Sequence, residues 1–314
     1  MNAISNPNFE AESLPWLDRY IAEVERYCED IESQWIPDLR GALVSWLQRG
    51  LVIFEDVVPH ELIDRYADCV SDFLNDPEEA SGVRLTVEGY GVATAGELPK
   101  SALSQHHLRI MDFHNASQTG KQLSLLPVIV EFLQHVFRDQ VVAMQSLTFI
   151  HSTEQSTHQD FPYVASGILS HLAATWIPLE DVHEDAGPLY YYPSSHHIPK
   201  FEWGDGLTLT PESDQTPETF ASYLDDVCSS YGLTKETFLP KKGDVLFWHA
   251  GLVHGGGAVS NPSLTRKSYV THYSTGTAYP HDRRSPDTVP IIHQINGGLV
   301  YGDPLNINQE NTYA

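Results

Sequence analysis

The sequence predicts a mainly β fold, in which a barrel or double-sheet core is wrapped by helices from the N-terminal part. Helical spacing of apolar residues dominates up to about residue 137, and short β-prone apolar runs dominate residues 140–275. The length of 314 residues and the hydrophobic content of 41% allow one large domain with a sizeable core. We therefore expect residues 1–314 to form a single domain.

Helical patterns make up most of the N-terminal part. Residues 1–35 are acidic and look helical, and a second helical pattern over residues 37–49 ends at Gly50, a residue suited to a helix C-terminus. The apolar run 51–54 predicts a short buried strand. Helical spacing resumes over residues 60–74. The N-terminal part therefore predicts three helical segments with one strand between the second and the third.

The following segments are polar loops, one further helix and a series of strands. Residues 77–120 are rich in Gly and polar groups and predict loops with short strands, and residues 125–137 predict a helix opened by a proline. β-prone runs predict strands at 141–150, 168–178, 190–192, 245–248 and 268–273. An acidic insertion, 202–240, contains a predicted helix near 217–229, and a polar tail, 278–314, is predicted to be loop.

The charge balance argues against polyanionic partners. Acidic residues outnumber basic residues 42 to 18, which gives a formal net charge of −24. Nucleic acids and anionic membrane surfaces are also negatively charged, so the electrostatic field of this protein repels both. No apolar run reaches the roughly 18 residues of a membrane span, and the N-terminus lacks a signal-peptide pattern. We expect a cytoplasmic protein with a small-molecule substrate; the sequence does not indicate its oligomeric state.

The first candidate metal ligands are His158 and Asp160, a His-x-Asp pair placed after a predicted strand. On an extended segment, residues two apart point to the same side, so an imidazole and a carboxylate can bind one ion. Such a pair also occurs by chance in polar turns. The pair therefore needs a second segment to identify a metal site.

That second segment is an apolar strand followed by His254 and three glycines, residues 255–257. Small residues beside a ligand let backbone and cofactor approach closely. His249 is an alternative distal ligand in the same segment, but the glycines beside His254 favour His254. Two histidines and one carboxylate on one face of an octahedron leave three positions open, which suits ferrous iron that binds a co-substrate and oxygen.

A third element, Arg266 and Ser268, follows His254 at a spacing of 12 residues to the arginine. A guanidinium fork matches a carboxylate, and a hydroxyl two residues further along a strand lies on the same face. This pair would hold the distal carboxylate of 2-oxoglutarate. The spacing to Arg266 is a second reason to prefer His254 over His249.

These motifs, taken in order, resemble the phytanoyl-CoA dioxygenase-like family of iron(II)/2-oxoglutarate-dependent oxygenases, with gaps, from about residue 39 to residue 273. The matching segments are 47–54, 158–160, 175–181, 187–189, 193–196, 243–244, 254–255, Asn261 and Arg266. The resemblance implies a double-stranded β-helix, a jelly roll of the cupin-like kind, with iron on His158, Asp160 and His254. It also implies that Arg266, Trp176 and Gln145 line the 2-oxoglutarate site.

The resemblance implies Fe(II) as cofactor and 2-oxoglutarate and O2 as co-substrates. The activity that we expect is that of a dioxygenase, most simply a hydroxylase. Such an enzyme hydroxylates an unactivated carbon of a small molecule while 2-oxoglutarate is decarboxylated to succinate. Halogenating relatives replace the carboxylate ligand with a small residue, whereas this chain keeps Asp160. Desaturation or cyclisation of a natural-product intermediate needs no change in the ligands and remains an alternative.

Five further residues are candidates for substrate contact. Phe161, Tyr163 and Trp248 lie near the metal ligands in the sequence, although core packing explains each of them equally well. Arg109 and Met111 lie in a segment that we expect to fold over the mouth of the active site. The substrate itself depends on the segments 77–120 and 202–240, which carry no recognisable motif.

Two classes of function remain as rivals. A zinc-type metallohydrolase uses the same three ligands with a bound water, but its chemistry does not need Arg266 and Ser268. A non-catalytic cupin-like binding module needs no metal ligands, so the intact set of His158, Asp160 and His254 argues against it.

Overall fold

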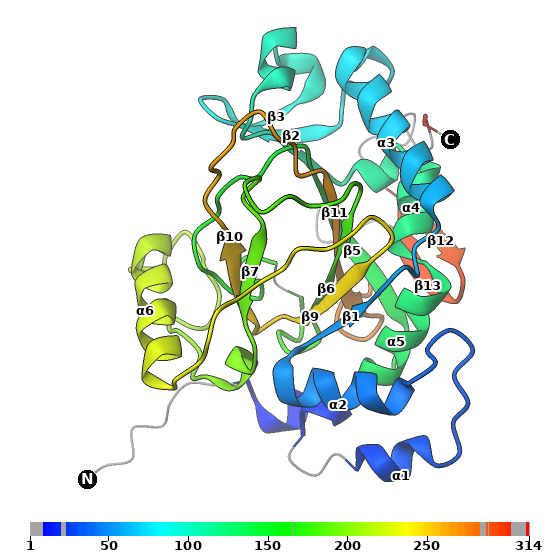
Figure 1. Cartoon of the computed structure of the whole chain (residues 1–314), viewed down its shortest axis with the longest axis vertical. Coiled ribbons are helices and arrows are strands. Elements are labelled where there is room, and N and C mark those ends of the chain that lie inside the picture. The colour runs from blue at the N-terminus through cyan, green and yellow to red at the C-terminus, as the bar shows by residue number, and fades with distance from the viewer. Residues whose placement is uncertain are drawn as a thin grey trace.

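Two mostly antiparallel sheets form the centre of the structure, a computed structural model that describes residues 9–19, 23–164, 166–282, 287, 289–302 and 312–313 (Figure 1). The large sheet has the strand order β1-β9-β6-β11-β5-β4-β2-β3, with β13 beside β5 and β12 beside β13. Its strands are β1 (Leu51–Phe54), β2 (Arg84–Val87), β3 (Gly91–Thr94), β4 (Arg109–Met111), β5 (Val141–Phe149), β6 (Ala173–Pro178), β9 (Val245–His249), β11 (Ser268–Thr275), β12 (Ile292–Ile295) and β13 (Gly298–Tyr301).

The small sheet stands opposite the large one and has the order β10-β7-β8 (Figure 1). It consists of β7 (Leu189–Tyr192), β8 (Glu236–Thr237) and β10 (Val253–Gly256). The mainly β fold with two facing, mostly antiparallel sheets confirms the predicted jelly-roll class. The predicted strands at 51–54, 141–150, 168–178, 190–192, 245–248 and 268–273 all exist, with the bounds given above.

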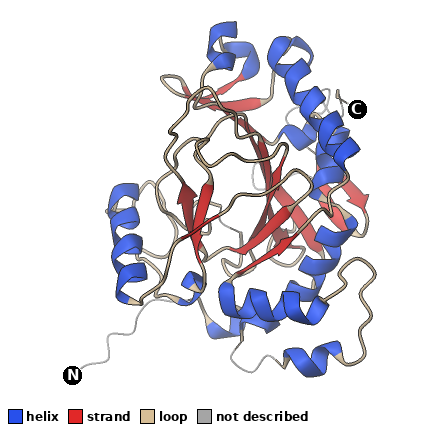
Figure 2. Cartoon of the chain, viewed as in Figure 1, coloured by secondary structure: helices blue, strands red, loops and turns tan. Residues whose placement is uncertain are grey.

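Helices from the N-terminal part cover the outer face of the large sheet (Figure 2). They are α2 (Leu39–Arg49), α3 (His60–Asn75), α4 (Gln118–Ser124) and α5 (Pro127–Phe137), and the short helix α1 (Val24–Cys28) packs against α2. Alternation along β11 explains the arrangement: Tyr269 joins the core cluster with the helices, whereas Val270 joins the cluster with the small sheet. Because both faces of the large sheet are covered, β5, β6, β9 and β11 are buried along almost their whole length.

The end of α2 lies at the predicted residue, Gly50, which has φ +73°. A Cβ there would lie 2.4 Å from Nδ1 of His196, so the position favours glycine for its backbone conformation and for its close packing. At the start of the same helix, the side chain of Asp38 accepts a hydrogen bond from the backbone N–H of Gly41.

The acidic insertion forms an outer layer beside the small sheet. Its helix α6 (Pro217–Ser230) was predicted, and it buries Phe220, Leu224 and Cys228 in a cluster with Val253 of β10. The end of the insertion returns as β8, which pairs with β7. The insertion is therefore anchored directly against the strand that carries His254.

Two expectations from the sequence were wrong. Among the described residues before 35, only Ala11–Ser13, Trp16–Asp18 and Val24–Cys28 are helical; the expectation at residues 1–8 and 20–22 lies outside the described residues. The tail is not all loop, because β12 and β13 form a hairpin whose second strand pairs in parallel with β5. Its turn is made by Asn296 and Gly297, both with positive φ, and this Asn-Gly pair is a recognised hairpin signal.

The helical part and the β core share one hydrophobic cluster, and β1 to β4 from the helical part belong to the large sheet. We take this shared core as support for the proposal of one domain. No helix in the described ranges is long and apolar enough to cross a membrane.

Candidate metal and co-substrate site

Backbone pairing brings the three predicted metal ligands together. His158 lies in the segment after β5, and its main chain forms an isolated antiparallel bridge with His254 in β10. The two N–H···O distances of this bridge are 2.9 and 3.0 Å. Asp160 is fixed in turn by its backbone N–H, which donates to the carbonyl of Ala250 at 3.2 Å. These bonds place two segments of distant sequence next to each other.

One nitrogen of each imidazole and one carboxylate oxygen face a common point. Nε2 of His158 and Nε2 of His254 each lie 3.7 Å from Oδ1 of Asp160, and the three ligand atoms all lie within 4.8 Å of one another. The Nδ1 atoms lie 2.8 Å from the carbonyl of Ser156 and 3.0 Å from the carbonyl of Leu252. Since a carbonyl only accepts, each Nδ1 carries the proton and each Nε2 has its lone pair free for a metal.

The electrostatic environment favours the metal-binding forms of these groups. Burial, with a contribution from His254, lowers the pKa of His158 to about 3. Burial alone would raise the pKa of Asp160, but His254 and His272 outweigh it and hold that pKa below its usual range. At neutral pH the His158 imidazole is therefore neutral and the Asp160 carboxylate is ionised, as metal ligation requires.

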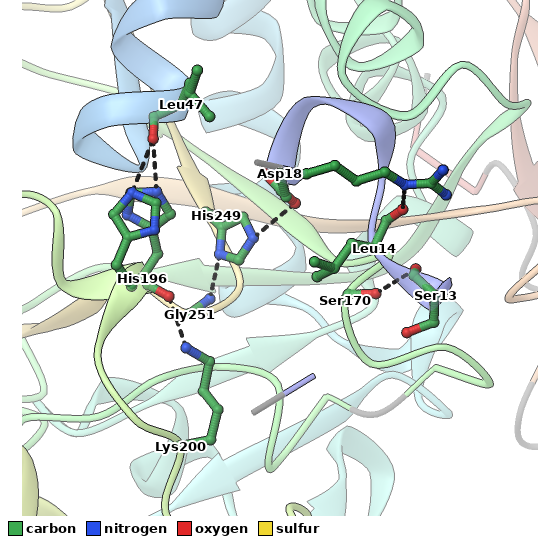
Figure 3. Close-up of polar contacts among 11 residues, drawn as sticks. Ser13, Leu14, Asp18, Leu47, Ser170, His196, Lys200, His249 and Gly251 are labelled. Atoms are coloured by element: carbon green, nitrogen blue, oxygen red, sulfur yellow. Dashed lines mark hydrogen bonds and ion pairs between the residues drawn. The ribbon is translucent and has the colours of Figure 1, made fainter. Parts of the chain in front are cut away.

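The alternative ligand His249 lies in a different polar cluster, at the side of the barrel where the N-terminal segment packs (Figure 3). Its Nε2 is 3.2 Å from a carboxylate oxygen of Asp18, and its Nδ1 accepts a hydrogen bond from the N–H of Gly251 at 2.9 Å. Its ring packs against Trp46 and His196. Both ring nitrogens of His249 are thus engaged in structural contacts. His249 is therefore not part of the metal-ligand triad, which consists of His158, Asp160 and His254.

The triad opens into a cavity of about 570 Å³. Most of the residues selected from the sequence line this cavity: Arg109, Met111, Gln145, His158, Asp160, Tyr163, Trp176, Trp248, His254 and Arg266. Residues 217 and 218, at the start of α6, also line it. The cavity therefore joins the predicted metal ligands, the predicted co-substrate residues and the acidic insertion.

Phe161 does not line the cavity, contrary to its interpretation as a substrate contact. Its side chain is fully buried and packs edge-to-face against Phe9, with ring centroids 4.9 Å apart. The chain turns after Asp160, whose carbonyl accepts the N–H of Tyr163. This turn directs Phe161 into the core, whereas Tyr163 faces the cavity.

Arg266 is a cation that lines the cavity and is only 5% exposed. Its side chain donates one hydrogen bond to the carbonyl of Gly187 at 3.0 Å, and its Nε has no partner among the described residues. Burial lowers its pKa to about 10, so it remains charged at neutral pH. The hydroxyl of Ser268, which is also buried, has no partner either, although Ser268 is not among the residues that line the cavity. Buried donors without acceptors are costly unless a ligand supplies the acceptors.

The residues present fit iron and 2-oxoglutarate. Two neutral imidazoles and one carboxylate are the donor set of non-haem ferrous sites with open positions. The unpaired Nε of Arg266 and Oγ of Ser268 are the donors that a carboxylate needs. Trp176, whose ring centre is 5.8 Å from the Arg266 guanidinium carbon, provides an apolar wall beside this charge.

His272 is a site residue that was not predicted from the sequence. This histidine lines the cavity, and its Nε2 lies 3.5 Å from Oδ2 of Asp160. Alternation along β11 from Ser268 through Val270 indicates the same inner face, so the signal was present in the spacing.

The chain is similar to known proteins in sequence and in fold. Rat (Rattus norvegicus) peroxisomal phytanoyl-CoA dioxygenase is 20% identical over 245 residues, which cover 73% of this chain and 66% of that protein. The epimerase SnoN from nogalamycin biosynthesis, in complex with Fe3+, alpha ketoglutarate and nogalamycin RO, superposes with a TM-score of 0.58 at 18% identity, covering 83% of this chain and 98% of SnoN. EctD from S. alaskensis with 2-oxoglutarate and 5-hydroxyectoine gives a TM-score of 0.55 at 18% identity, covering 79% and 81% of the two chains.

These likenesses show the fold, which is the cupin-like jelly roll expected from the sequence. The family model described as phytanoyl-CoA dioxygenase (PhyH) matches residues 46–268, which include all three triad residues and Arg266. The chain therefore belongs to the phytanoyl-CoA dioxygenase family of iron(II)/2-oxoglutarate-dependent oxygenases.

Proposed function

We propose that this protein is an iron(II)/2-oxoglutarate-dependent dioxygenase that hydroxylates an unactivated carbon of a small-molecule metabolite. The observation that carries the proposal is a single cavity that contains the His158, Asp160 and His254 ligand atoms together with the partly unsatisfied guanidinium of Arg266. A zinc-type hydrolase would leave the buried guanidinium of Arg266 without a role. The oxygenase hypothesis explains both the metal ligands and this cation.

Each residue has a definite task in this proposal. His158, Asp160 and His254 would hold iron(II), which, when bound, supplies the activation of O2 that is coupled to conversion of 2-oxoglutarate into succinate and carbon dioxide. Arg266 and Ser268 would bind the distal carboxylate of 2-oxoglutarate by charge-assisted hydrogen bonds. Trp176 and Gln145 would flank the co-substrate and keep water from its buried end.

The rest of the cavity is available for the substrate. A volume of about 570 Å³ is in the range of small-molecule sites. Met111 and Tyr163 offer apolar and aromatic surface in the cavity, and Arg109 offers a part-buried cation that donates to Gln155 at 3.3 Å. We propose these three residues as substrate contacts, and the start of α6 as the part of the insertion that limits substrate size.

Hydroxylation is favoured over halogenation because Asp160 occupies the carboxylate position of the metal site. This carboxylate leaves no place for a halide at that position. Desaturation and cyclisation would use the same ligands and remain the alternative outcome. Epimerisation belongs with them, since the relatives of similar fold include enzymes named as an epimerase and a carbocyclase.

The proposal is tested with purified protein, Fe(II), ascorbate and 2-oxoglutarate under air. Slow formation of succinate should occur without substrate, and it should increase when a metabolite panel reaches the correct compound. Use of ¹⁸O2 then separates the reactions, because hydroxylation adds one labelled oxygen to the product whereas desaturation and epimerisation add none. Absence of both succinate formation and 2-oxoglutarate binding would overturn the assignment.

A further inference from the structure

The two oxygens of the Asp160 carboxylate have different surroundings. Oδ1 faces the Nε2 atoms of His158 and His254, at 3.7 Å from each. Oδ2 accepts a hydrogen bond from the indole Nε1 of Trp248 at 2.6 Å. Nε2 of His272 lies 3.5 Å from the same oxygen. One oxygen is thus directed to the metal position and the other is bound to the protein.

The two groups that hold Oδ2 come from separate strands of the large sheet. Trp248 is in β9 and His272 is in β11, with β6 between them in the sheet. Both residues are only 3% exposed. An indole N–H is a donor only, so its short contact with the carboxylate is a charge-assisted hydrogen bond with one possible direction.

The position of Oδ2 matters because a carboxylate binds a metal through one oxygen or through both. Two imidazoles and a single oxygen use three positions of an octahedral ion and leave three open. Two of the open positions are needed by 2-oxoglutarate and the third by O2. A carboxylate that bound through both oxygens would occupy the third position and block the reaction.

We propose that Trp248 and His272 are positioning residues that restrict Asp160 to one-oxygen ligation and so keep the third position open. The proposal rests on the proposed function, since it assumes that the triad binds an octahedral metal ion together with 2-oxoglutarate. It gives Trp248 a task that differs from the substrate contact expected from the sequence.

The test uses Mn(II) as the probe and the full-length chain as the Trp248→Phe and His272→Leu variants. Water-proton relaxation of the Mn(II)-loaded protein reports how many exchangeable waters remain on the ion. With saturating 2-oxoglutarate, the wild type should retain one such water, and Trp248→Phe should lose it, lowering the relaxation enhancement at least twofold. The affinity for Mn(II) should change by less than about tenfold, while succinate formation should fall by about 10–100-fold.

The matched control is Trp46→Phe, because Trp46 is also fully buried and its indole nitrogen has no partner among the described residues. Trp46→Phe should leave relaxation unchanged. Equal relaxation in wild type, Trp248→Phe and His272→Leu would overturn the positioning role, and so would complete loss of Mn(II) binding in both variants. Failure of the wild type itself to lose waters when 2-oxoglutarate is added would instead contradict the proposed function.

Discussion

Replacing His254 with alanine should weaken Fe(II) binding by about 10²–10³-fold, because one of three ligands contributes roughly 3–4 kcal/mol of metal-binding free energy. Formation of succinate from 2-oxoglutarate should fall below detection in the same variant. Both effects follow from the position of His254 Nε2, which faces Oδ1 of Asp160 across the metal position. Anaerobic titration with Fe(II) and a succinate assay measure the two effects.

His249→Ala is the matched control, since it removes a second buried histidine from the same segment of chain. It should leave Fe(II) affinity within a few-fold of the wild type. It should lower the free energy of unfolding by about 1–3 kcal/mol, because Asp18 and the N–H of Gly251 lose their partner. Denaturant titration measures this loss. If His249→Ala abolished Fe(II) binding and His254→Ala did not, the triad would have been assigned wrongly.

Arg266→Gln should raise the dissociation constant for 2-oxoglutarate by about 10–100-fold, which corresponds to the loss of roughly 1.5–3 kcal/mol of charge-assisted hydrogen bonding. Fe(II) affinity should stay nearly unchanged, since the guanidinium is not among the ligand atoms of the triad. Anaerobic calorimetry with Fe(II)-loaded protein measures both constants on the same samples.

Two further variants show whether the effect is specific to this arginine. Arg266→Lys keeps the charge but not the planar fork, so its affinity for 2-oxoglutarate should fall between those of Arg266→Gln and the wild type. Arg84→Gln removes a part-buried arginine that pairs with Asp112 away from the cavity, and should not change 2-oxoglutarate affinity. An equal loss of iron and 2-oxoglutarate binding in Arg266→Gln would mean that Arg266 is structural.

Local patterns predicted most of the fold. The end of α2 at Gly50 and the start of α6 at Pro217 depend on the conformations of single residues, which the sequence indicates directly. The strands of the core were visible as apolar runs because both faces of the large sheet are covered. The pairing of β13 with β5 was not predicted, since it joins residues far apart in the chain and has no local signal beyond the Asn296-Gly297 turn.

Local spacing in the sequence also predicted most residues of the candidate site. The spacing between His254 and Arg266 distinguished His254 from His249, and the structure brings His254 to the other ligands. Phe161 was named as a candidate substrate contact with core packing as the alternative, and its ring lies in the core, beside the turn that follows Asp160. The contact between Trp248 and Asp160 could not be predicted, because it depends on how β9 and the segment after β5 are placed in space.

The most direct test of the central claim is calorimetric titration of 2-oxoglutarate into the metal-free and the Fe(II)-loaded protein in the absence of oxygen. If the His158, Asp160 and His254 triad and Arg266 serve one ligand, Fe(II) should tighten 2-oxoglutarate binding at least about tenfold, equivalent to about 1.4 kcal/mol. His254→Ala should remove this dependence on Fe(II). Binding that is equally tight with and without Fe(II), or no binding in either state, would contradict a shared metal and oxo-acid site.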